Sequence, residues 1–489
     1  MKFNNKNCTN NMSFEDCEMV ILRQAVEETE NITGKELVNN EEVTNMLNIV
    51  EQFIIDKKLV CYGGTAINNI LPVYDQFYKK DIEIPDYDFF SNNALEDAKE
   101  LANIYYENGY NDVEAKAGVH KGTFKVFVNY IPVADITYMH PGLFDKILKD
   151  SIKIAGIHYC PPDFLRMGMY LELSRPKGDV SRWEKVLKRL NLLNKHHPLK
   201  LGKSCKFLHN NKKQNNQTYN IVKQLLINNE AVFFGGYAMD LYNKFNKKGK
   251  KMMNISNPDF DVLYEDPSKL ALIIEEELER NNIKNVKKIE YNEVGELIPY
   301  HIELKVNNES IIFIYKPVAC HNYNRIKYQK EQINIATIDT ILAFYLAFYY
   351  SDLPQYDNNR LMCVAAFLVN ALEKNKLDES GIFKRYSLDC IGKQPTLKSM
   401  RSEKADKFRE LKNNRTSSEY EMWFLNYSPF KVDDKIINSK ETLLKSQESQ
   451  KTKTSITKKN KKVKKKNKTR TTRTSDKKVK DILNNIFKK

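Results

Sequence analysis

One pattern occurs twice along this chain, and it limits the folds that the chain can adopt. In each copy an apolar run ends on paired glycines, and two aspartates separated by one residue follow. From the second glycine to the first aspartate the interval is 22 residues in the first copy and 23 in the second. The residues concerned are Gly63-Gly64 with Asp86 and Asp88, and Gly235-Gly236 with Asp259 and Asp261. Order, chemistry and spacing all recur, so the pattern predicts two copies of one domain.

The first copy begins with a predicted strand, a tight turn and a helix. Residues 59–62 are mostly apolar, Gly63 and Gly64 follow, and Thr65 opens a segment with helical character. Glycine lets a phosphate approach the backbone closely, and a helix N-terminus presents unpaired N–H groups to an anion. We therefore predict that this turn binds a triphosphate, with the Thr65 hydroxyl as a further donor. The alternative is a purely structural turn.

Asp86 and Asp88 are predicted to lie on one face of a strand. Because side chains alternate along a strand, these carboxylates point one way while Tyr87 and Phe89 point into the core. Two adjacent carboxylates repel each other unless a cation lies between them. Mg²⁺ prefers oxygen ligands and is usually shared with substrate phosphates. The alternative is that the pair forms the solvated face of an edge strand.

Asp135 is an ionisable residue inside an apolar strand, between Ala134 and Ile136. An ionised group is rarely buried without a partner. If this strand lies beside the strand that carries Asp86 and Asp88, the three carboxylates form a cluster that can hold two metal ions. Two such ions activate a hydroxyl and bracket an in-line phosphoryl transfer. Asp86, Asp88 and Asp135 are therefore the predicted catalytic and metal-binding residues.

This constellation resembles the DNA polymerase β-like nucleotidyltransferase superfamily, which combines an apolar strand, a glycine turn, a carboxylate pair and a third carboxylate on a later strand. Segments 61–66, 84–90 and 179–185 are similar to those of viral poly(A) polymerase catalytic subunits, found in poxviruses and other large cytoplasmic DNA viruses. The resemblance implies template-independent addition of AMP from ATP to the 3′ end of mRNA, with two Mg²⁺ or Mn²⁺ ions and release of pyrophosphate. It also implies a cytoplasmic location, in the virus factory or the virion.

The resemblance assigns a role to the helical region 163–194 as well. In the family, the region after the third carboxylate supplies cations to the triphosphate, and Arg182 and Lys185 are the candidates here. Basic residues in such a helix are otherwise a solvated face. Two other functions remain open. The chain could be a different terminal nucleotidyltransferase, acting on RNA with UTP or at a tRNA 3′ end, or a non-catalytic RNA-binding subunit.

The second copy lacks a third carboxylate at the matching place. Aligning residues 306–307 with 128–129 places Phe313 where Asp135 stands. Glu303 comes too early to replace it. We predict that the second copy keeps the fold without the chemistry and acts as a scaffold, an RNA platform or a dimer surface. A homodimer is one arrangement that this leaves open.

The excess positive charge is confined to the C-terminal end. Residues 440–489 hold 19 Lys and Arg against four acidic residues, which accounts for the whole net charge of +15. We predict a disordered tail that retains RNA through its phosphates, or one that only solubilises or targets the chain. No apolar run is long enough to span a bilayer, so we expect no membrane partner. The eight cysteines lack metal-ligand spacing and predict reduced thiols in a cytosolic protein.

Together these features predict an α+β fold with two tandem nucleotidyltransferase domains, each with helical additions. The expected divisions are a helical segment at 1–40, the catalytic domain at 41–209, the second domain at 218–380, a docking segment at 381–439 and the tail at 440–489.

Overall fold

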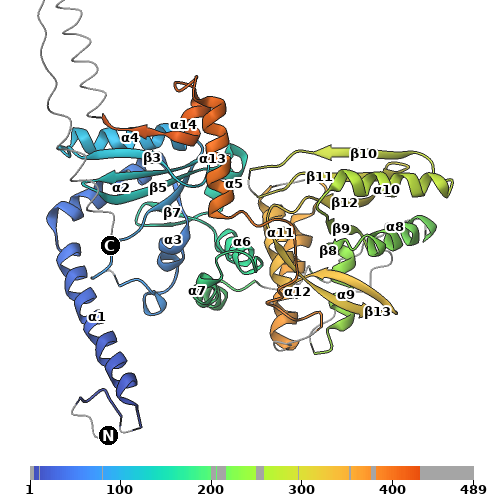
Figure 1. Cartoon of the computed structure of the whole chain (residues 1–489), viewed down its shortest axis with the longest axis horizontal. Helices are drawn as coiled ribbons and strands as arrows, with labels where there is room; N and C mark the ends of the chain where they lie inside the picture. The colour runs from blue at the N-terminus through green and yellow to red at the C-terminus, as the bar shows by residue number, and fades with distance from the viewer. Residues whose placement is uncertain are drawn as a thin grey trace, which may run out of the picture. The chain divides into compact units, whose positions relative to one another are not determined.

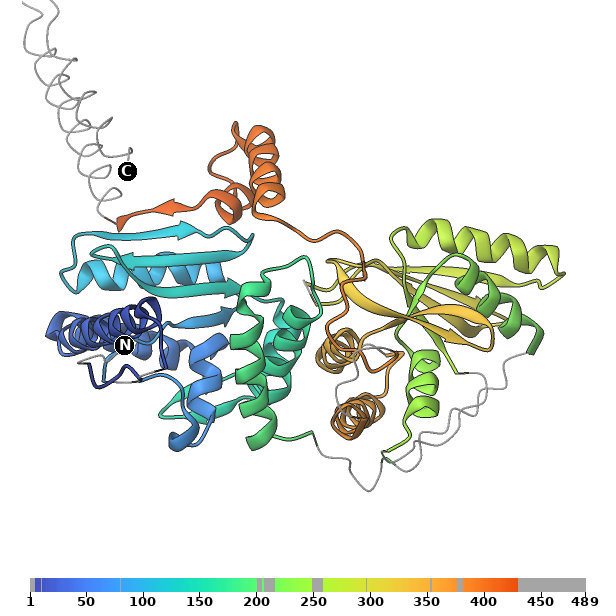
Figure 2. The same ribbon diagram turned by 60° about the horizontal axis from the view of Figure 1, so that its bottom comes forward.

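The computed structural model describes residues 5–9, 11–79, 81–199, 205, 216–248, 258–295, 297–351, 354–375 and 381–429. Residues 1–430 belong to one compact unit, and the predicted tail at 440–489 lies outside the described residues. Figure 1 and Figure 2 show two β-sheets with helices packed against them. The fold is thus a mixed α/β fold, and the predicted domain boundaries within this unit stay predictions.

The first sheet has eight strands in the order β16-β3-β4-β5-β2-β1-β7-β6. Their bounds are β1 Val60–Cys61, β2 Asp88–Ser91, β3 Val113–Ala117, β4 Thr123–Val128, β5 Ile131–Tyr138, β6 Ile152–Ile154, β7 Ile157–Tyr159 and β16 Asn426–Tyr427. Alternating apolar residues explain the central strands. In β4, Phe124, Val126 and Val128 are fully buried and the residues between them are not.

The elements that accompany this sheet are α1 Phe14–Val38, α2 Glu41–Lys57, α3 Gly63–Ile70, the 3₁₀ turn η1 Val73–Asp75, α4 Ala94–Glu107, α5 Pro141–Lys149, α6 Pro162–Leu173, the 3₁₀ turn η2 Val180–Arg182 and α7 Trp183–His196. The sequence predicts one helical region over 163–194, whereas the structure has a break between α6 and α7. Pro176 and Gly178 lie in that break. Both residues disfavour a continuous helix, because proline removes a backbone donor and glycine loses the most backbone entropy.

The second sheet also has eight strands, in the order β10-β11-β12-β9-β8-β14-β13-β15. Their bounds are β8 Val232–Phe233, β9 Phe260–Leu263, β10 Val286–Tyr291, β11 His301–Val306, β12 Glu309–Tyr315, β13 His321–Tyr328, β14 Glu331–Ala336 and β15 Cys390–Ile391. Its helices are α8 Asn216–Asn228, α9 Gly236–Phe245, α10 Pro267–Arg280, α11 Ile338–Ser351 and α12 Asn358–Asn375.

The same strand pairings occur in both sheets. β1 and β2 are antiparallel, as are β8 and β9. β2 and β5 are parallel, as are β9 and β12. β1 and β7 are parallel, as are β8 and β14. The two glycine-and-aspartate patterns of the sequence therefore lie at equivalent places, between β1 and β2 and between β8 and β9.

Helices α6 and α11 pack against each other and connect the two halves. The ring of Phe164 in α6 lies 5.3 Å from that of Tyr350 in α11 and 5.8 Å from that of Phe90 beside the glycine turn. The main chain adds a contact here, because the amide of Asn322 donates to the carbonyl of Ser174 at 2.9 Å. A continuous apolar core therefore runs from one sheet to the other.

The segment after the second sheet returns to the first. Helices α13 Leu397–Leu411 and α14 Ser418–Phe424 precede β16, which pairs antiparallel with β3. Figure 2 shows this segment in orange along the edge of the first sheet. Trp423 is buried, and Glu421 pairs with Lys99 of α4 at 2.8 Å. Tyr427 adds a side-chain contact, because its hydroxyl donates to Asn103 of α4 at 2.6 Å.

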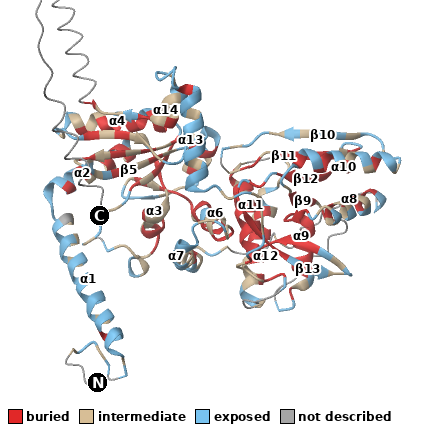
Figure 3. Cartoon of the chain, viewed as in Figure 1, coloured by how far each residue is buried: buried red, intermediate tan, exposed pale blue. Residues whose placement is uncertain are grey.

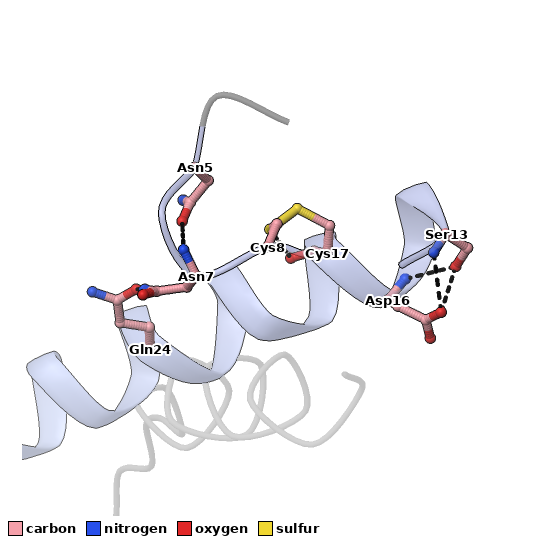
Figure 4. Close-up of a disulfide and its surroundings, with 7 residues drawn as sticks. All are labelled: Asn5, Asn7, Cys8, Ser13, Asp16, Cys17 and Gln24. Atoms are coloured by element: carbon pink, nitrogen blue, oxygen red, sulfur yellow. Dashed lines mark hydrogen bonds between the residues drawn. A yellow bond between two sulfur atoms is a disulfide. The ribbon is translucent and has the colours of Figure 1, made fainter. Parts of the chain in front are cut away.

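Helix α1 is exposed along most of its length, as the blue colour in Figure 3 shows. Near its start, a disulfide joins Cys8 to Cys17 (Figure 4). Two further disulfides join Cys205 to Cys363 and Cys320 to Cys390, and only Cys61 and Cys160 are free. The prediction of reduced thiols is therefore wrong for six of the eight cysteines. Two of these pairs are 158 and 70 residues apart, so only the fold brings them together.

Among the described residues, no helix is long and apolar enough to cross a membrane.

Candidate active site

The glycine turn between β1 and α3 lies directly against the carboxylate of Asp88. Gly63 has a φ of +72°, and a Cβ added there would lie 2.6 Å from Asp88 Oδ2. Gly64 faces the Tyr78 hydroxyl and the Arg189 guanidinium, so a side chain there would meet both. Both positions therefore favour glycine. Helix α3 begins at this turn, so the unpaired N–H groups of its first residues lie beside the acidic cluster.

Asp86 and Asp88 lie at the start of β2. The sequence predicts both within a strand, whereas β2 begins at Asp88 and Asp86 comes just before it. The alternation is nevertheless present, because Asp86 is exposed and Tyr87 is 4% exposed. Tyr87 donates its hydroxyl to Glu51, and its carbonyl accepts from the amide of Asp135 at 3.0 Å. These bonds hold the segment between the two aspartates in place.

Asp135 lies in β5, directly beside Asp88. The two residues are register partners in the parallel pair of β2 and β5. In the antiparallel pair of β4 and β5, Asp135 is the partner of Lys125. The Lys125 ammonium forms an ion pair with the Asp135 carboxylate. The structure thus brings the three predicted aspartates together and places a lysine beside them.

Burial, together with the surrounding negative charge, raises the pKa values of Asp86 and Asp88. Burial raises the pKa of Asp88 to about 7; the charges of Asp86 and Asp135 add to this rise, and Lys125 and Arg182 oppose it. Although Asp86 as a whole is exposed, its carboxyl is partly desolvated, which raises its pKa; Asp135 adds to the rise and Lys125 opposes it. Because the repulsion is only partly compensated, a bound cation would be stabilising here.

Two arginines face this site from the break before α7 and from α7 itself. Arg182 lies at the end of η2, where it pairs with Glu172 at 3.2 Å, and its charge lowers the pKa of Asp88. Arg189 reaches the glycine turn and donates to the Tyr78 hydroxyl at 2.9 Å. A guanidinium in this position can bind phosphate oxygens with its remaining N–H groups.

Lys185 lies exposed on α7. Its predicted contact with the triphosphate stays a prediction, whereas Arg182 lies near enough to act electrostatically on the acidic cluster.

The Thr65 hydroxyl has a different role from the predicted one. Thr65 is buried, and its hydroxyl donates to the backbone carbonyl of Asp86 at 2.7 Å. A hydroxyl has one proton to donate, so this bond leaves none for a phosphate. Thr65 therefore ties α3 to the segment before β2 and positions Asp86.

A divalent cation fits the donor set, although the described residues contain no group of three His, Cys, Asp or Glu side chains already arranged around a metal position. Asp135 is engaged by Lys125, so Asp86 and Asp88 are the first candidates to bind the cation. Mg²⁺ and Mn²⁺ accept carboxylate oxygens, and Mg²⁺ commonly completes its coordination with water and substrate phosphates. The raised pKa values of Asp86 and Asp88 also favour a cation.

Sequence reasoning missed Lys125, Tyr78 and Arg189 as members of this site. A signal existed for Lys125, because the hairpin of β4 and β5 places it opposite Asp135. Arg189 and Tyr78 are 111 residues apart, and no local pattern links them. Their meeting depends on how α7 packs near the glycine turn.

Part of the chain matches known proteins in sequence. Residues 48–179 match the family model described as "Poly(A) polymerase catalytic subunit". A putative poly(A) polymerase catalytic subunit of African swine fever virus is 37% identical over 174 residues, which cover 34% of this chain and 36% of that protein. The one from Acanthamoeba polyphaga mimivirus is 33% identical over 162 residues, which cover 32% of this chain and 26% of that protein. The chain therefore aligns with about a quarter to a third of the length of these relatives.

The fold extends beyond the matched segment. The crystal structure of the Megavirus polyadenylate synthase superposes with a TM-score of 0.73 at 19% identity, over 88% of this chain and 89% of that one. The two chains therefore share a fold over most of their length. Residues 48–179 are therefore similar to the corresponding part of poly(A) polymerase catalytic subunits, including putative ones from large DNA viruses.

Proposed function

We propose that the chain is a template-independent poly(A) polymerase that adds AMP from ATP to the 3′ end of mRNA. The observation that carries this proposal is the register of Asp88 and Asp135 on neighbouring strands beside the Gly63-Gly64 turn. The family match over residues 48–179 includes all of these residues and supports adenylate as the transferred group.

In the proposed reaction, the oxygen of the RNA 3′-hydroxyl forms a bond to the α-phosphorus of ATP. The bond from that phosphorus to the bridging oxygen breaks, pyrophosphate leaves, and the hydroxyl proton passes to water or a carboxylate. Mg²⁺ or Mn²⁺ ions, two of them in the proposed mechanism, supply the positive charge that this transfer requires. Asp86, Asp88 and Asp135 would hold them.

The remaining groups bind and orient the nucleotide. The N–H groups at the start of α3 face the region where phosphate would lie, and Gly63 and Gly64 leave space for it. Arg189 is assigned to the triphosphate on the side of Tyr78. Arg182 and Lys185 are also assigned to the triphosphate of ATP. Asp135 is assigned to the side of the attacking hydroxyl, with Lys125 holding its carboxylate in place until substrate binds.

We further propose that the second sheet belongs to a nucleotidyltransferase-like domain without catalysis. In the pair of β9 and β12, Asp261 is the register partner of Phe313, whereas Asp88 has Asp135. The third carboxylate is therefore replaced by an aromatic ring. ATP and RNA are the proposed substrates, and the cytoplasmic virus factory or virion is the proposed location. A partner subunit, a homodimer and RNA retention by the tail at 440–489 are further proposals.

The test is extension of a labelled RNA primer with each of the four NTPs separately, in Mg²⁺ and in Mn²⁺. Long tails with ATP alone are expected. Tails made with UTP would show that the site transfers nucleotides but that the function is uridylyl transfer. No extension under any condition would refute the proposal. Asp86→Ala/Asp88→Ala is the inactive control, because it removes the proposed ligands of the cation.

A further inference from the structure

A cavity of about 540 Å³ occupies the place in the second sheet that corresponds to the active site of the first. Its wall includes Gly236, Asp259 and Asp261, the second copy of the glycine-and-aspartate pattern. The local geometry is also repeated, because a Cβ added to Gly235 would meet the Asp261 carboxylate as one at Gly63 would meet that of Asp88. The volume lies within the range of about 300–1,000 Å³ that is typical of small-molecule sites.

The charge of this cavity differs from that of the first site. Glu303 is the partner of Phe313 in the pair of β11 and β12, at the position that Lys125 holds opposite Asp135. Five carboxylates and only two basic side chains line the cavity. Both basic groups are already near carboxylates, with Arg360 3.7 Å from Asp259 and Lys305 3.3 Å from Glu303. At the first site Arg189 faces the glycine turn, whereas no basic side chain among the residues that line this cavity lies away from a carboxylate, so a triphosphate would meet net repulsion here.

Aromatic rings supply a second part of the wall. Phe313, Tyr345 and Tyr356 all line the cavity. The rings of Phe313 and Tyr356 have centroids 6.1 Å apart, and Tyr356 is held by stacking on Phe348 at 4.4 Å. Its hydroxyl is fixed as well, because it donates to Asp261 at 2.8 Å. Rigid aromatic faces of this kind bind flat heteroaromatic rings, which proteins use to hold unstacked bases of RNA.

The polar groups of the wall call for a ligand with both donors and acceptors. When they are ionised, the carboxylates of Asp259, Asp261 and Glu303 accept hydrogen bonds and cannot donate them. The amide nitrogen of Gln355 is a donor, and it is buried without a hydrogen-bond partner among the residues that the structure describes. Adenine offers an exocyclic amine beside ring nitrogens that accept, and glutamine pairs with this combination. A neutral base satisfies both needs without bringing a phosphate into the cavity.

We propose that this cavity binds one adenine base, with the phosphates of its strand outside. The proposal deepens the proposed function, because the base would come from the RNA tail that the first site extends, and it gives the second domain a role in holding product. Uracil lacks an exocyclic amine, so it fits the carboxylates less well. ATP is excluded by the charge of its triphosphate rather than by its base.

The test is photolabelling of the full chain with 2-azidoadenosine and, separately, with 2-azido-ATP in Mg²⁺, followed by mapping of the labelled peptides. The expected result is that 2-azidoadenosine labels the segment around Tyr345 and Tyr356, whereas 2-azido-ATP labels only the first site. Unlabelled oligo(A) should compete for the second site and oligo(U) should compete at least tenfold less well. Labelling of the second site by both probes, or by neither, would overturn the proposal.

Gln355→Leu tests the same assignment by removing the donor with little change of volume. It should lower labelling of the second site by 2-azidoadenosine about tenfold at subsaturating probe, since a lost hydrogen bond to a buried group has roughly that effect. Asn359→Leu is the matched control, because Asn359 is exposed on α12 and does not line the cavity. Equal labelling of both variants with unchanged thermal melting would contradict the role of Gln355. These readouts do not depend on transfer, so failure here and failure of primer extension can be told apart.

Discussion

Replacing Asp88 by Asn should stabilise the protein in the absence of metal while abolishing its proposed activity. Burial of its carboxyl, with the nearby charges of Asp86 and Asp135, raises the pKa of Asp88 from the ordinary 3.8 to about 7. Ionisation of Asp88 therefore costs free energy in the folded chain. Asn keeps the shape of the side chain and carries no charge, so the variant avoids that cost.

The sign and size follow from the difference between the two pKa values. Unfolded Asp88 ionises near 4 and folded Asp88 near 7, so the free energy of unfolding falls as the pH rises between them. A shift of about 3 units corresponds to about 4 kcal/mol at most, at about 1.4 kcal/mol per unit. Because the side chain is partly exposed, solvent reduces this figure, and we expect about 1–2 kcal/mol above pH 7.5.

The assay is thermal unfolding in EDTA at pH 8 and pH 5. Asp88→Asn should raise Tm by about 1–2 °C at pH 8 and by less than half of that at pH 5. Asp145→Asn, at an exposed position on α5, is the matched control and should change Tm little at either pH. With Mn²⁺ and ATP added, the wild type should gain stability and Asp88→Asn should not. A variant no more stable than the control, or a larger gain at pH 5, would refute the reasoning.

Three further predictions concern other parts of the chain. Asp135→Asn should abolish AMP transfer and leave the Kd for ATP, measured by equilibrium binding, within about threefold of the wild type. The reason is that a cation can still bind without the charge of Asp135. A large loss of ATP binding would contradict the assignment of Asp135 to the side of the attacking hydroxyl. Arg189→Met should weaken ATP binding about tenfold, whereas Lys188→Met, on the exposed face of α7, should not; equal effects of the two would show that Arg189 does not touch the nucleotide. Arg385→Met should lower the free energy of unfolding by about 3 kcal/mol in urea, because it leaves Asp339 buried without its bidentate partner; a loss below about 1 kcal/mol would mean that water reaches the pair.

Much of the acidic site could be predicted because its parts are local in sequence. The strand, the glycine turn and Asp86 with Asp88 lie within 30 residues of one another. Asp135 could be added because a charged residue inside an apolar strand needs a partner. The sequence alignment makes Phe313 the equivalent of Asp135. The register of β9 and β12 agrees, because it pairs Phe313 with Asp261.

The features that could not be predicted depend on contacts distant in sequence. Arg189 reaches the glycine turn only because α7 folds back after a break, at a place where the sequence predicts continuous helix. The disulfides of Cys205 and Cys320 depend on partners far along the chain. Thr65 was assigned to a phosphate because a free hydroxyl beside a glycine turn fits one, but burial gives it a backbone partner instead.

The central claim is that nucleotidyl transfer takes place at the first glycine-and-aspartate pattern and not at the second. The most direct measurement compares the double variants Asp86→Asn/Asp88→Asn and Asp259→Asn/Asp261→Asn in addition of the first AMP to a saturating RNA primer. The rate of this addition should fall at least a hundredfold more for the first pair than for the second. Thermal melting should show that both variant proteins are folded. Equal losses, or a greater loss for the second pair, would contradict it.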